Sequence, residues 1–322
     1  MKPFPTATAT TTTKSLSTAF IKRARSTSAL QADANVKLQA FRQVVHARKS
    51  TKKFEPNRIV PDGVWRDILG MTLTSPSGFN LQPTHILLLR SSPIKSTLSK
   101  HAMLGVGNQY RTVDASGIAV FCTDLEPSKR IDRVYELERE GGVREEGYMA
   151  VLRVAATFLT GEANTHGPTW GGGSSAHLST FFKQSFTKAM SPVQPMPSME
   201  NVESWSYKNA GIMAQMYTMA ATAHGLSTCI MEGFDSRRAK EILRIPDRYG
   251  VPLMVATGYE FGSPAVIHED VPEDDNDLLD AASQHRRTPR LDMNEVFFGE
   301  SFGEPLDFLM ESNLQFEKKA VA

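Results

Sequence analysis

The feature that most constrains the fold of this chain is a polar loop at residues 74–83, which reads Thr-Ser-Pro-Ser-Gly-Phe-Asn-Leu-Gln-Pro. A helical pattern over 64–73 precedes the loop, and an apolar run over 86–89 predicts a strand after it. Pro76 and Pro83 stop regular structure at both ends of the loop. The fold must therefore place a helix and a strand on either side of one polar turn.

This loop carries more polar groups than a plain connection between a helix and a strand needs. Gly78 lets the backbone come close to a bound molecule. Ser77, Asn80 and Gln82 add hydrogen-bond donors and acceptors. Two interpretations are open from these residues alone: a helix-to-strand connection capped by its own Ser and Asn, or one wall of a ligand site.

The length, composition and net charge of the chain limit the class of protein to which it can belong. With 322 residues, 40% of them hydrophobic and 22% charged, the chain can bury a core as one large domain or two average ones. Its formal net charge of +1 gives no reason to expect nucleic-acid binding, and no apolar run reaches the roughly 18 residues that membrane insertion needs. Cys122 and Cys229 lie in apolar runs without metal-ligand spacing, which predicts buried thiols in a reducing compartment and no metal site.

The N-terminal segment differs from everything that follows. Its first acidic residue is Asp33, and before it Thr and Ser alternate with scattered Lys and Arg. This composition cannot build a core, and it is typical of an organellar transit peptide. We expect residues 1–34 to be a transit peptide with a mitochondrial address. A plastid address, or a cytoplasmic protein with a disordered extension, are the alternatives.

Apolar runs and helical patterns alternate along the remaining chain. They predict strands over 86–90, 118–122, 227–231 and 252–258, and helices over 34–45, 64–73, 93–100, 205–225 and 236–243. Ser92 and Ser236 are the expected N-caps of two of these helices. The pattern predicts an α+β domain in which helices cover a central sheet.

Two regions allow more than one interpretation. The helix at 205–225 is apolar on nearly all sides, which predicts a central core helix or one buried partly against a second subunit. Residues 126–204 have the weakest pattern, apart from a charged helix expected over 130–156. We interpret this region as an excursion from the main domain, either a lid or a solvated insertion without a role.

A basic cluster follows the first predicted helix. Arg48, Ser50 and Lys52 alternate along the chain, and alternate residues of an extended segment point to one side. A guanidinium, a hydroxyl and an ammonium on one side suit a phosphate, although such a cluster is also typical of a solvated helix C-terminus. A second basic cluster, Arg-Arg-Thr-Pro-Arg-Leu, lies at 286–291.

Five segments in this order resemble the FMN-dependent nitroreductase family, and the resemblance covers roughly residues 40–300. They read Arg-Lys-Ser-Thr-Lys-Lys-Phe at 48–54, Pro-Ser-Gly-Phe-Asn-Leu-Gln-Pro at 76–83, Asn-Gln-Tyr-Arg-Thr-Val-Asp-Ala at 108–115, Glu-Gly-Phe-Asp at 232–235 and Thr-Pro-Arg-Leu at 288–291. The last segment departs from the family pattern, because Thr288 stands where the family has a basic residue. Arg287 would take its place.

The resemblance implies an architecture as well as a cofactor. It implies a central, mostly antiparallel sheet covered by helices, in a domain-entwined homodimer that binds FMN at its interface. The FMN-binding domain would span residues 35–300, with 126–204 as its excursion, and residues 301–322 would form a C-terminal tail.

The resemblance also implies which residues hold the phosphate end of FMN. Arg48, Ser50 and Arg290 would bind the phosphate, with Arg287 as a further cation, because a buried dianion needs charge-assisted partners. The loop would line the ring and the ribityl chain through Pro76, Ser77, Gly78, Asn80 and Gln82.

Other residues would face the reactive ring. Lys52 and Arg111 would lie at its pyrimidine edge, where a cation stabilises the negative charge of a reduced flavin. Asn108 would hydrogen-bond the amide-like edge. Gly233 would offer its N–H to the ring nitrogen that receives hydride, with Glu232 beside it. The implied catalytic residues are Glu232, Gly233 and Arg111.

The activity implied by the resemblance is hydride transfer from NADH or NADPH, through FMN, to a nitroaromatic, a quinone or a similar flat acceptor in a ping-pong cycle. Two alternatives share the motifs. One is a related flavoenzyme with a specialised reaction, such as reductive dehalogenation or flavin breakdown. The other is a flavin-binding redox sensor without turnover. The acceptor and the choice of nicotinamide are open at the level of sequence.

Overall fold

The computed structural model describes residues 33–142, 174–198, 200–262 and 288–306, with single positions between 147 and 160. The chain divides into two units, Met1–Asp270 and Val271–Ala322, and each is described by itself. The predicted transit peptide up to residue 32, Arg287 and the tail beyond 306 lie outside the described residues.

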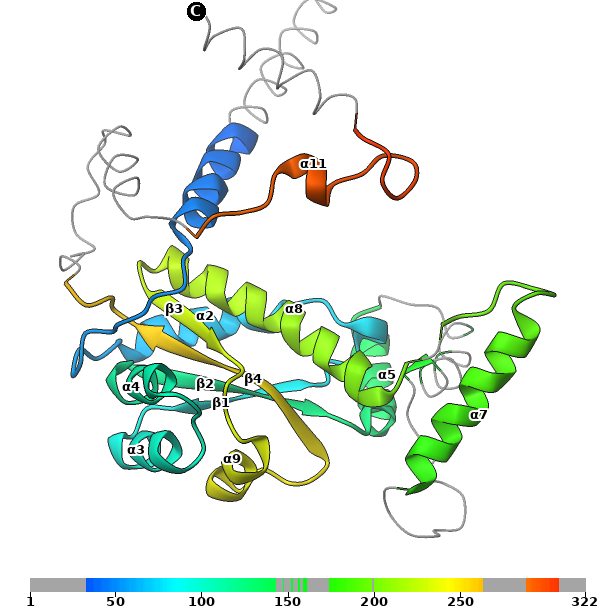
Figure 1. Cartoon of the computed structure of the whole chain (residues 1–322), viewed down its shortest axis with the longest axis horizontal. Helices are drawn as coiled ribbons and strands as arrows, with labels where there is room; N and C mark the ends of the chain where they lie inside the picture. The colour runs from blue at the N-terminus through cyan, green and yellow to red at the C-terminus, as the bar shows by residue number, and fades with distance from the viewer. Residues whose placement is uncertain are drawn as a thin grey trace, which may run out of the picture. The chain divides into compact units, whose positions relative to one another are not determined.

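The core of the first unit is a four-stranded sheet in the order β1-β2-β4-β3 (Figure 1). The strands are β1 (Thr84–Leu89), β2 (Gly117–Asp124), β3 (Ser227–Met231) and β4 (Tyr249–Gly258). All three pairings are antiparallel, which confirms the predicted sheet type and the four predicted strands. The first and third strands form the two edges of the sheet.

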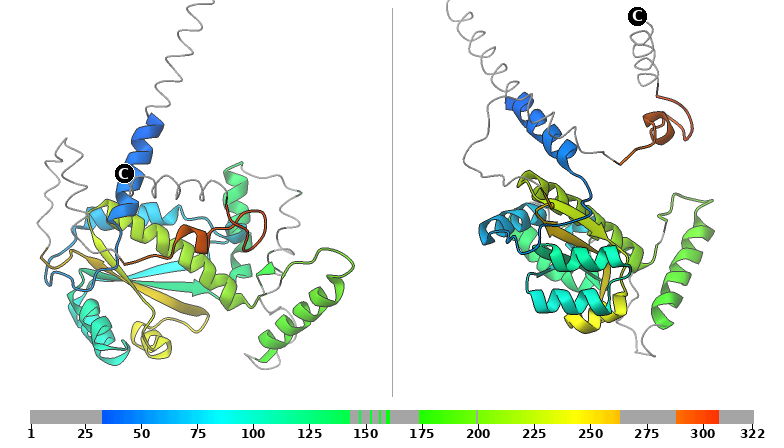
Figure 2. Two further views of the ribbon diagram at one scale, coloured as in Figure 1. Left: turned by 45° about the horizontal axis from the view of Figure 1, so that its top comes forward. Right: turned by 60° about the vertical axis from the view of Figure 1, so that its left-hand side comes forward.

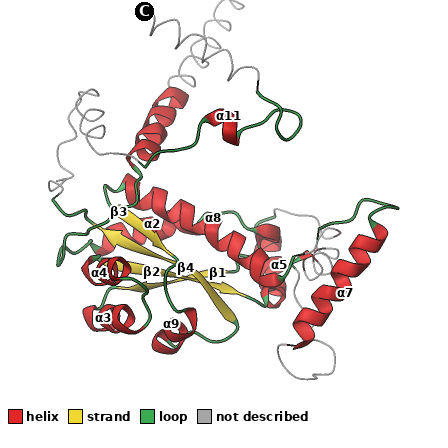
Figure 3. Ribbon diagram, viewed as in Figure 1, coloured by secondary structure: helices red, strands yellow, loops and turns green. Residues whose placement is uncertain are grey.

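Helices make up most of the remaining described residues (Figure 3). They are α2 (Asp62–Leu73), α3 (Ser92–His101), α4 (Val106–Asp114), α5 (Ile131–Glu140), α7 (Ser174–Met190), α8 (Val202–Ala223), α9 (Ser236–Leu243) and α11 (Met293–Val296), with short 3₁₀ turns η1 (Gly78–Asn80) and η2 (Pro127–Arg130). Residues 33–47 are also helical. Among the described residues, none of the helices has the length and apolar character needed to cross a bilayer.

Both faces of the sheet are buried, and the alternation along β2 shows how. Ala119 and Phe121 face a cluster built with α2 and α8, whereas Ile118 and Val120 face a cluster built with α3 and α9. Every residue of β2 is buried, as expected of a central strand covered on both sides. Figure 2 shows α2 and α8 on one face of the sheet and α3, α4 and α9 on the other.

The apolar helix at 205–225 is confirmed as the central core helix, α8. It contacts all four strands and α2, and the Tyr217 hydroxyl lies 2.9 Å from the Thr257 hydroxyl in the fully buried core. Gly225 ends the helix with a φ of 68°. On the opposite side of α8, Ile212 is 45% exposed and Met216 is 37% exposed, so the described residues leave this side uncovered.

Two expected N-caps are wrong. Ser92 is the first residue of α3, Ser91 occupies the cap position, and neither accepts a capping hydrogen bond there. At α9 the cap is Asp235 rather than Ser236, since the Asp235 carboxylate accepts a hydrogen bond of 3.0 Å from Arg238 N–H. In both cases the helix begins one residue away from the position that the sequence favoured, which is the usual uncertainty of helix boundaries.

Two helices of the first unit were not foreseen. The segment after Gly105 forms α4, which carries Asn108 and Arg111. The irregular region 126–204 contains α7. Within its predicted charged helix over 130–156, α5 is followed by a turn at 141–142, and the described positions 147, 152 and 156 are helical again. The polar composition of both segments hides their helical period.

The second unit is small among the described residues. Its helix α11 begins at a capping box, in which Asp292 Oδ1 accepts from Asn294 N–H at 3.0 Å and Glu295 Oε1 accepts from Asp292 N–H at 3.1 Å. The rings of Phe298 and Phe302 lie 4.7 Å apart.

Candidate functional site

Three predicted site residues meet beside the end of β3. Asn108 Nδ2 donates to Gly233 O at 3.2 Å and to Leu104 O at 3.1 Å, and Arg111 Nη1 donates to Asn108 Oδ1 at 2.9 Å. Asn108 and Gly233 are 125 positions apart in the sequence, so only the fold brings them together. The Asn108 amide thus links the guanidinium to the backbone after β3.

Close packing explains why residue 233 is a glycine. A Cβ atom at this position would lie 2.6 Å from Asn108 Nδ2, inside the contact distance of real atoms. Leu104 N–H also donates to Gly233 O at 2.9 Å, so the backbone on both sides is fixed. The exposed Glu232 follows directly on β3 and stands next to this junction.

Helix α4, which carries Asn108 and Arg111, is held by α3. The Lys95 ammonium donates to Val113 O at 3.0 Å and to Ala115 O, which are carbonyls at the C-terminal end of α4. Burial lowers the pKa of Lys95, and the charge of Asp114 partly offsets this shift. Ser99 Oγ adds a bond of 3.0 Å to Gln109 O.

The first basic cluster runs beside β3, where Ser50 forms an isolated bridge with Thr228. Thr51 N–H donates to Thr228 O at 3.0 Å, and Thr51 is 1% exposed whereas Ser50 and Lys52 on either side of it are exposed. The residues before and after Thr51 therefore share the outer side of an extended segment. Arg48 is half-buried at the start of this segment.

The charges of two predicted cations act on Cys229 of β3. Burial raises the pKa of the Cys229 thiol, and the charges of Arg111 and Lys52 act in the opposite direction. Both cysteines are free and buried, as predicted.

One donor at this corner has no partner. Arg111 Nε is buried and makes no hydrogen bond to the described residues. A buried N–H of a cation without an acceptor is costly, and such groups are rare unless a ligand or water completes them. This corner, defined by Lys52, Asn108, Arg111, Cys229 and Gly233, is called the cationic corner below, and it fits a ligand with acceptor atoms along one edge.

The predicted loop at 76–82 forms a second group. Ser77 Oγ accepts from Gln82 N–H at 2.9 Å, which closes the loop on itself, and Asn80 Nδ2 donates to Glu138 Oε1 of α5 at 3.1 Å. Phe79, Asn80 and Gln82 all have positive φ, between 46° and 55°. Three non-glycine residues in the left-handed region make this a strained segment, of the kind that accumulates at functional sites.

The close approach that Gly78 permits is to the chain itself. A Cβ at Gly78 would lie 2.8 Å from Cζ2 of Trp205, and Gly78 N–H donates to Asn209 Oδ1 at 2.9 Å. Both partners belong to the first turns of α8. Gly78 therefore lets the loop pack closely against α8. From the sequence alone, this close approach was expected to be to a ligand.

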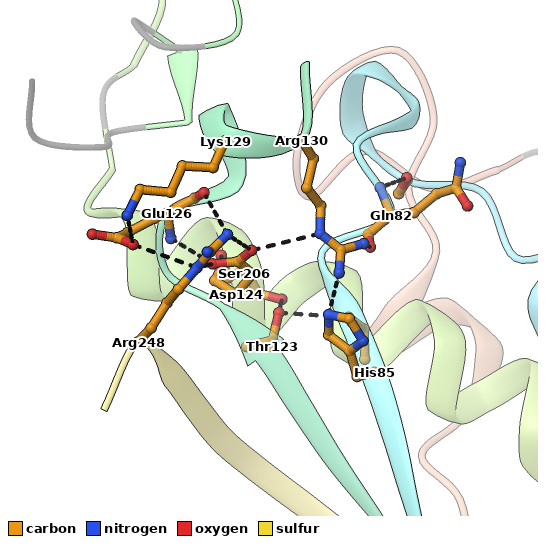
Figure 4. A network of polar contacts seen from close by, with 11 residues as sticks. Gln82, His85, Thr123, Asp124, Glu126, Lys129, Arg130, Ser206 and Arg248 are labelled. Atoms are coloured by element: carbon orange, nitrogen blue, oxygen red, sulfur yellow. Dashed lines mark hydrogen bonds and ion pairs between the residues drawn. The ribbon is translucent and has the colours of Figure 1, made fainter. Parts of the chain in front are cut away.

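A polar network supports the loop from the other side (Figure 4). Arg130 Nη1 donates to Gln82 O at 2.6 Å, and its Nη2 meets His85 Nε2. The fully buried Asp124 accepts from Arg248 at 2.7 and 2.5 Å and lies 3.5 Å from Arg130 Nε. Burial lowers the pKa of His85, and the charge of Arg130 lowers it further.

A pocket of about 170 Å³ lies between the loop and the start of β1. Its walls come from the loop, the start of β1, α8 and η2. They include Ser77, Gln82, His85, Arg130 and Asn209.

The cationic corner and the loop lie at opposite edges of the sheet. β1 and β3 are these two edges, and Thr84 pairs with Thr123 of β2 while Met231, two residues before Gly233, pairs through Met254 with Val120. Three strand spacings, about 15 Å, separate the two edges. One chain alone therefore does not bring the loop against the cationic corner.

Two predicted phosphate-binding residues belong to the second unit. Arg290 is exposed in the second unit, where its guanidinium contacts only Pro289 O among the described residues. Arg287 lies outside the described residues. In the described part of the chain, no cluster of His, Cys, Asp or Glu could hold a metal ion.

Several residues that build these two groups were missed from the sequence. They are Lys95, Cys229, His85, Arg130, Trp205 and Asn209. A lysine in an amphipathic helix or an asparagine in an apolar one gives little signal by itself. The polar Asn209 inside the apolar pattern of 205–225 was the one clue available.

Comparison with solved structures supports the fold. A nitroreductase family protein of Streptococcus pneumoniae aligns with a TM-score of 0.50 and 20% identity, over 81% of this chain and 100% of that one. A crystal structure described as a nitroreductase of Exiguobacterium sibiricum in complex with FMN aligns with a TM-score of 0.51 and 19% identity, over 74% of this chain and 95% of that one.

Sequence comparison agrees with the structural one. An NADH dehydrogenase of Thermus thermophilus is 25% identical over 221 residues, 68% of this chain and 86% of that protein. An oxygen-insensitive NADPH nitroreductase of Helicobacter pylori is 23% identical over 214 residues, 66% of this chain and 83% of that protein. The profile of the nitroreductase family matches residues 45–259. This chain therefore belongs to the nitroreductase family, a family of NAD(P)H oxidoreductase-type enzymes.

Proposed function

We propose that the protein is an FMN-dependent oxidoreductase that takes hydride from NADH or NADPH and reduces a nitroaromatic, a quinone or a similar flat acceptor. The observation that carries the proposal is the cationic corner. There the buried Arg111 Nε has no partner among the described residues, and the charges of Arg111 and Lys52 both act on Cys229. Two cations and an unused donor suit the edge of a ring that gains electrons.

The residues present fit FMN in chemistry. Bound FMN would supply the hydride-accepting ring. Lys52 and Arg111 would stabilise negative charge on it, and Asn108 would hold the Arg111 guanidinium through its bond of 2.9 Å. Arg48 and Ser50 lie on the same basic segment as Lys52, where they would bind the phosphate. A related fold in complex with FMN supports this choice of cofactor.

The enzyme would work as a homodimer with FMN at the interface. The cationic corner and the loop lie at opposite edges of the sheet in one chain, about 15 Å apart, so a flavin that touches both would take the loop of a second copy. The exposed side of α8, with Ile212 and Met216, gives an apolar surface that a second copy would cover. Phe41, 61% exposed on the helix at 33–47, adds to the uncovered apolar surface.

The test is direct. The purified protein should take up FMN, turn yellow, and lose the yellow colour anaerobically when NADH or NADPH is added. A panel of quinones and nitroaromatics in stopped flow should then restore the colour at measurable rates. A protein that does not take up FMN would overturn the proposal. The variant Arg111→Gln should bind FMN with a lower flavin reduction potential, because a cation next to the ring is lost.

A further inference from the structure

We infer that Asn209 and Arg130 are positioning residues that hold the two ends of the loop at 76–82, and through it one wall of the flavin site. The inference rests on the proposed function only in treating this loop as a wall for FMN. The contacts themselves are properties of the folded chain.

The loop needs such support because its backbone is strained. Phe79, Asn80 and Gln82 have φ values of 55°, 54° and 46°. A left-handed backbone conformation is unfavourable for any residue other than glycine. It persists only where the surrounding structure fixes it. The 3₁₀ turn at Gly78–Asn80 is too short to fix the loop alone.

Asn209 holds the beginning of the loop. Its Oδ1 accepts from Gly78 N–H at 2.9 Å, and its Nδ2 donates to Trp205 O at 2.8 Å, so both ends of the amide are engaged. Asn209 is 7% exposed, and the Trp205 ring occupies the space next to Gly78. The first turns of α8 therefore fix the position and the direction of the Gly78 peptide.

Arg130 holds the end of the loop. Its Nη1 donates to Gln82 O at 2.6 Å, four residues after Gly78, while Asp124 at 3.5 Å orients the guanidinium from the buried end of β2. Its Nη2 meets His85 Nε2, which must be the acceptor because a guanidinium only donates. Figure 4 shows Arg130 between Gln82, His85 and Asp124.

The two supports differ in their response to pH. The charged groups facing His85 are Arg130 from η2, Asp124 from β2 and Arg248 before the Tyr249 ring of β4. A protonated His85 would lose its acceptor atom and place a second positive charge against Arg130. Acid should therefore weaken the support at Gln82 and leave the neutral contact of Asn209 unchanged.

The experiment compares FMN affinity and apoprotein stability in three variants. Asn209→Leu removes one support and Arg130→Gln removes the other, and each should weaken FMN binding by about tenfold, because a buried hydrogen bond to the loop is lost. Thr218→Val is the matched control. It removes a buried side-chain bond of 2.9 Å to Gln215 O in the same helix, away from the loop. It should leave FMN affinity within about twofold.

Two further readouts separate positioning from a general loss of stability. Arg130→Lys, which keeps one cationic donor, should restore part of the affinity. The affinity of the wild-type protein should fall as the pH drops below about 6.5, and this dependence should shrink in Arg130→Gln. Loss of FMN affinity in the Thr218→Val control as large as in the other two variants would overturn the inference, and so would unchanged affinity in both loop variants.

A readout without flavin keeps this inference separate from the proposed function. In a protein whose other tryptophans, Trp65 and Trp170, are replaced by Phe, Trp205 reports on the loop through its contact with Gly78. Asn209→Leu should shift the emission of Trp205 and increase its quenching by acrylamide. If the wild-type protein binds no FMN but this shift occurs, the proposed function fails and the positioning stands. If the emission and quenching are unchanged, the positioning of the loop by Asn209 is wrong.

Discussion

The cationic corner and the loop are built in opposite ways. At the cationic corner, α4 and the end of β3 position Asn108, Arg111 and Gly233, and the buried Arg111 Nε has no partner among the described residues. In the loop, the side chains of Ser77 and Asn80 are used within the chain, and the strained backbone is held by α8, α5 and η2. A polar motif in a sequence can therefore signal either a ligand contact or the bonds that give a loop its shape.

The largest effect on stability is expected from a change at Asp124, which belongs to the polar network beside the loop and not to the cationic corner. It is fully buried and bound to Arg248 at 2.7 and 2.5 Å. Asp124→Asn removes the buried carboxylate that Arg130 and Arg248 share and should lower the free energy of unfolding by about 3–5 kcal/mol. Urea denaturation measures this loss. Glu126→Gln is the control, since Glu126 is 28% exposed and its removal should cost about 1 kcal/mol or less. Equal losses in the two variants would contradict this account of the network.

The next effect is expected at Gly78, where the loop meets α8. A methyl group would lie 2.8 Å from the Trp205 ring, so Gly78→Ala should cost about 1–3 kcal/mol through overpacking and should weaken FMN binding. Gly63→Ala is the matched control, because nothing lies within 4 Å of a Cβ there. If Gly78→Ala is as stable as Gly63→Ala, the loop does not pack on Trp205 as described.

The corresponding change at the cationic corner should be smaller. In Gly233→Ala the new methyl group meets the end of the Asn108 side chain at 2.6 Å, and this amide can swing away. The cost should be about 1–2 kcal/mol for the lost hydrogen bonds. The flavin reduction potential should also change, because Arg111 loses the contact that orients it. Gly211→Ala on α8 has open space around it and should gain about 0.5–1 kcal/mol. An unchanged potential in Gly233→Ala would remove Asn108 and Gly233 from the site.

The fold was largely predictable from the sequence, because its signals are local. Continuous apolar runs predicted β2 and β4, and the apolar helix at 205–225 predicted the core position of α8. α7 was missed, because the Ser, Thr, Lys and Gln among its residues leave no clear apolar face in the sequence. Its position in the weakly patterned region 126–204 made the omission harder to correct.

The site was predictable only in part, because its geometry is not local. Motif resemblance selected Asn108, Arg111 and Gly233, but their contact depends on a pairing across 125 residues. The partners that hold them, such as Lys95, carry no motif. The resemblance also assigned Gly78 to the ligand, whereas its backbone is packed against Trp205. Each of these contacts depends on packing between residues far apart in the chain, which local sequence patterns do not reveal.

The smallest effect is expected from His85, which stands at the foot of the loop. Its pKa in the folded protein is lowered, mainly by burial and then by Arg130. The contribution of His85 to stability is therefore complete above about pH 6.5 and is lost as the pH falls toward the lower pKa of the folded state. His85→Gln keeps an acceptor without this titration, so its melting temperature should fall less between pH 7 and pH 5 than that of the wild type. Identical pH profiles would show that His85 does not respond to acid as described.

The central claim is that one flavin site combines the cationic corner of one copy with the loop of another, and subunit mixing tests it most directly. Arg111→Gln, which lowers the flavin reduction potential, and Gly78→Ala, which weakens FMN binding, are unfolded in urea, mixed in equal amounts and refolded. Random pairing makes half of the dimers mixed, each with one intact site, so about a quarter of the FMN sites should regain both the wild-type affinity and the wild-type reduction potential. Arg111→Gln mixed with Gly233→Ala, both at the cationic corner, should give no recovery. If the first mixture also recovers nothing while wild-type chains refold, the site lies within one chain and the account is wrong.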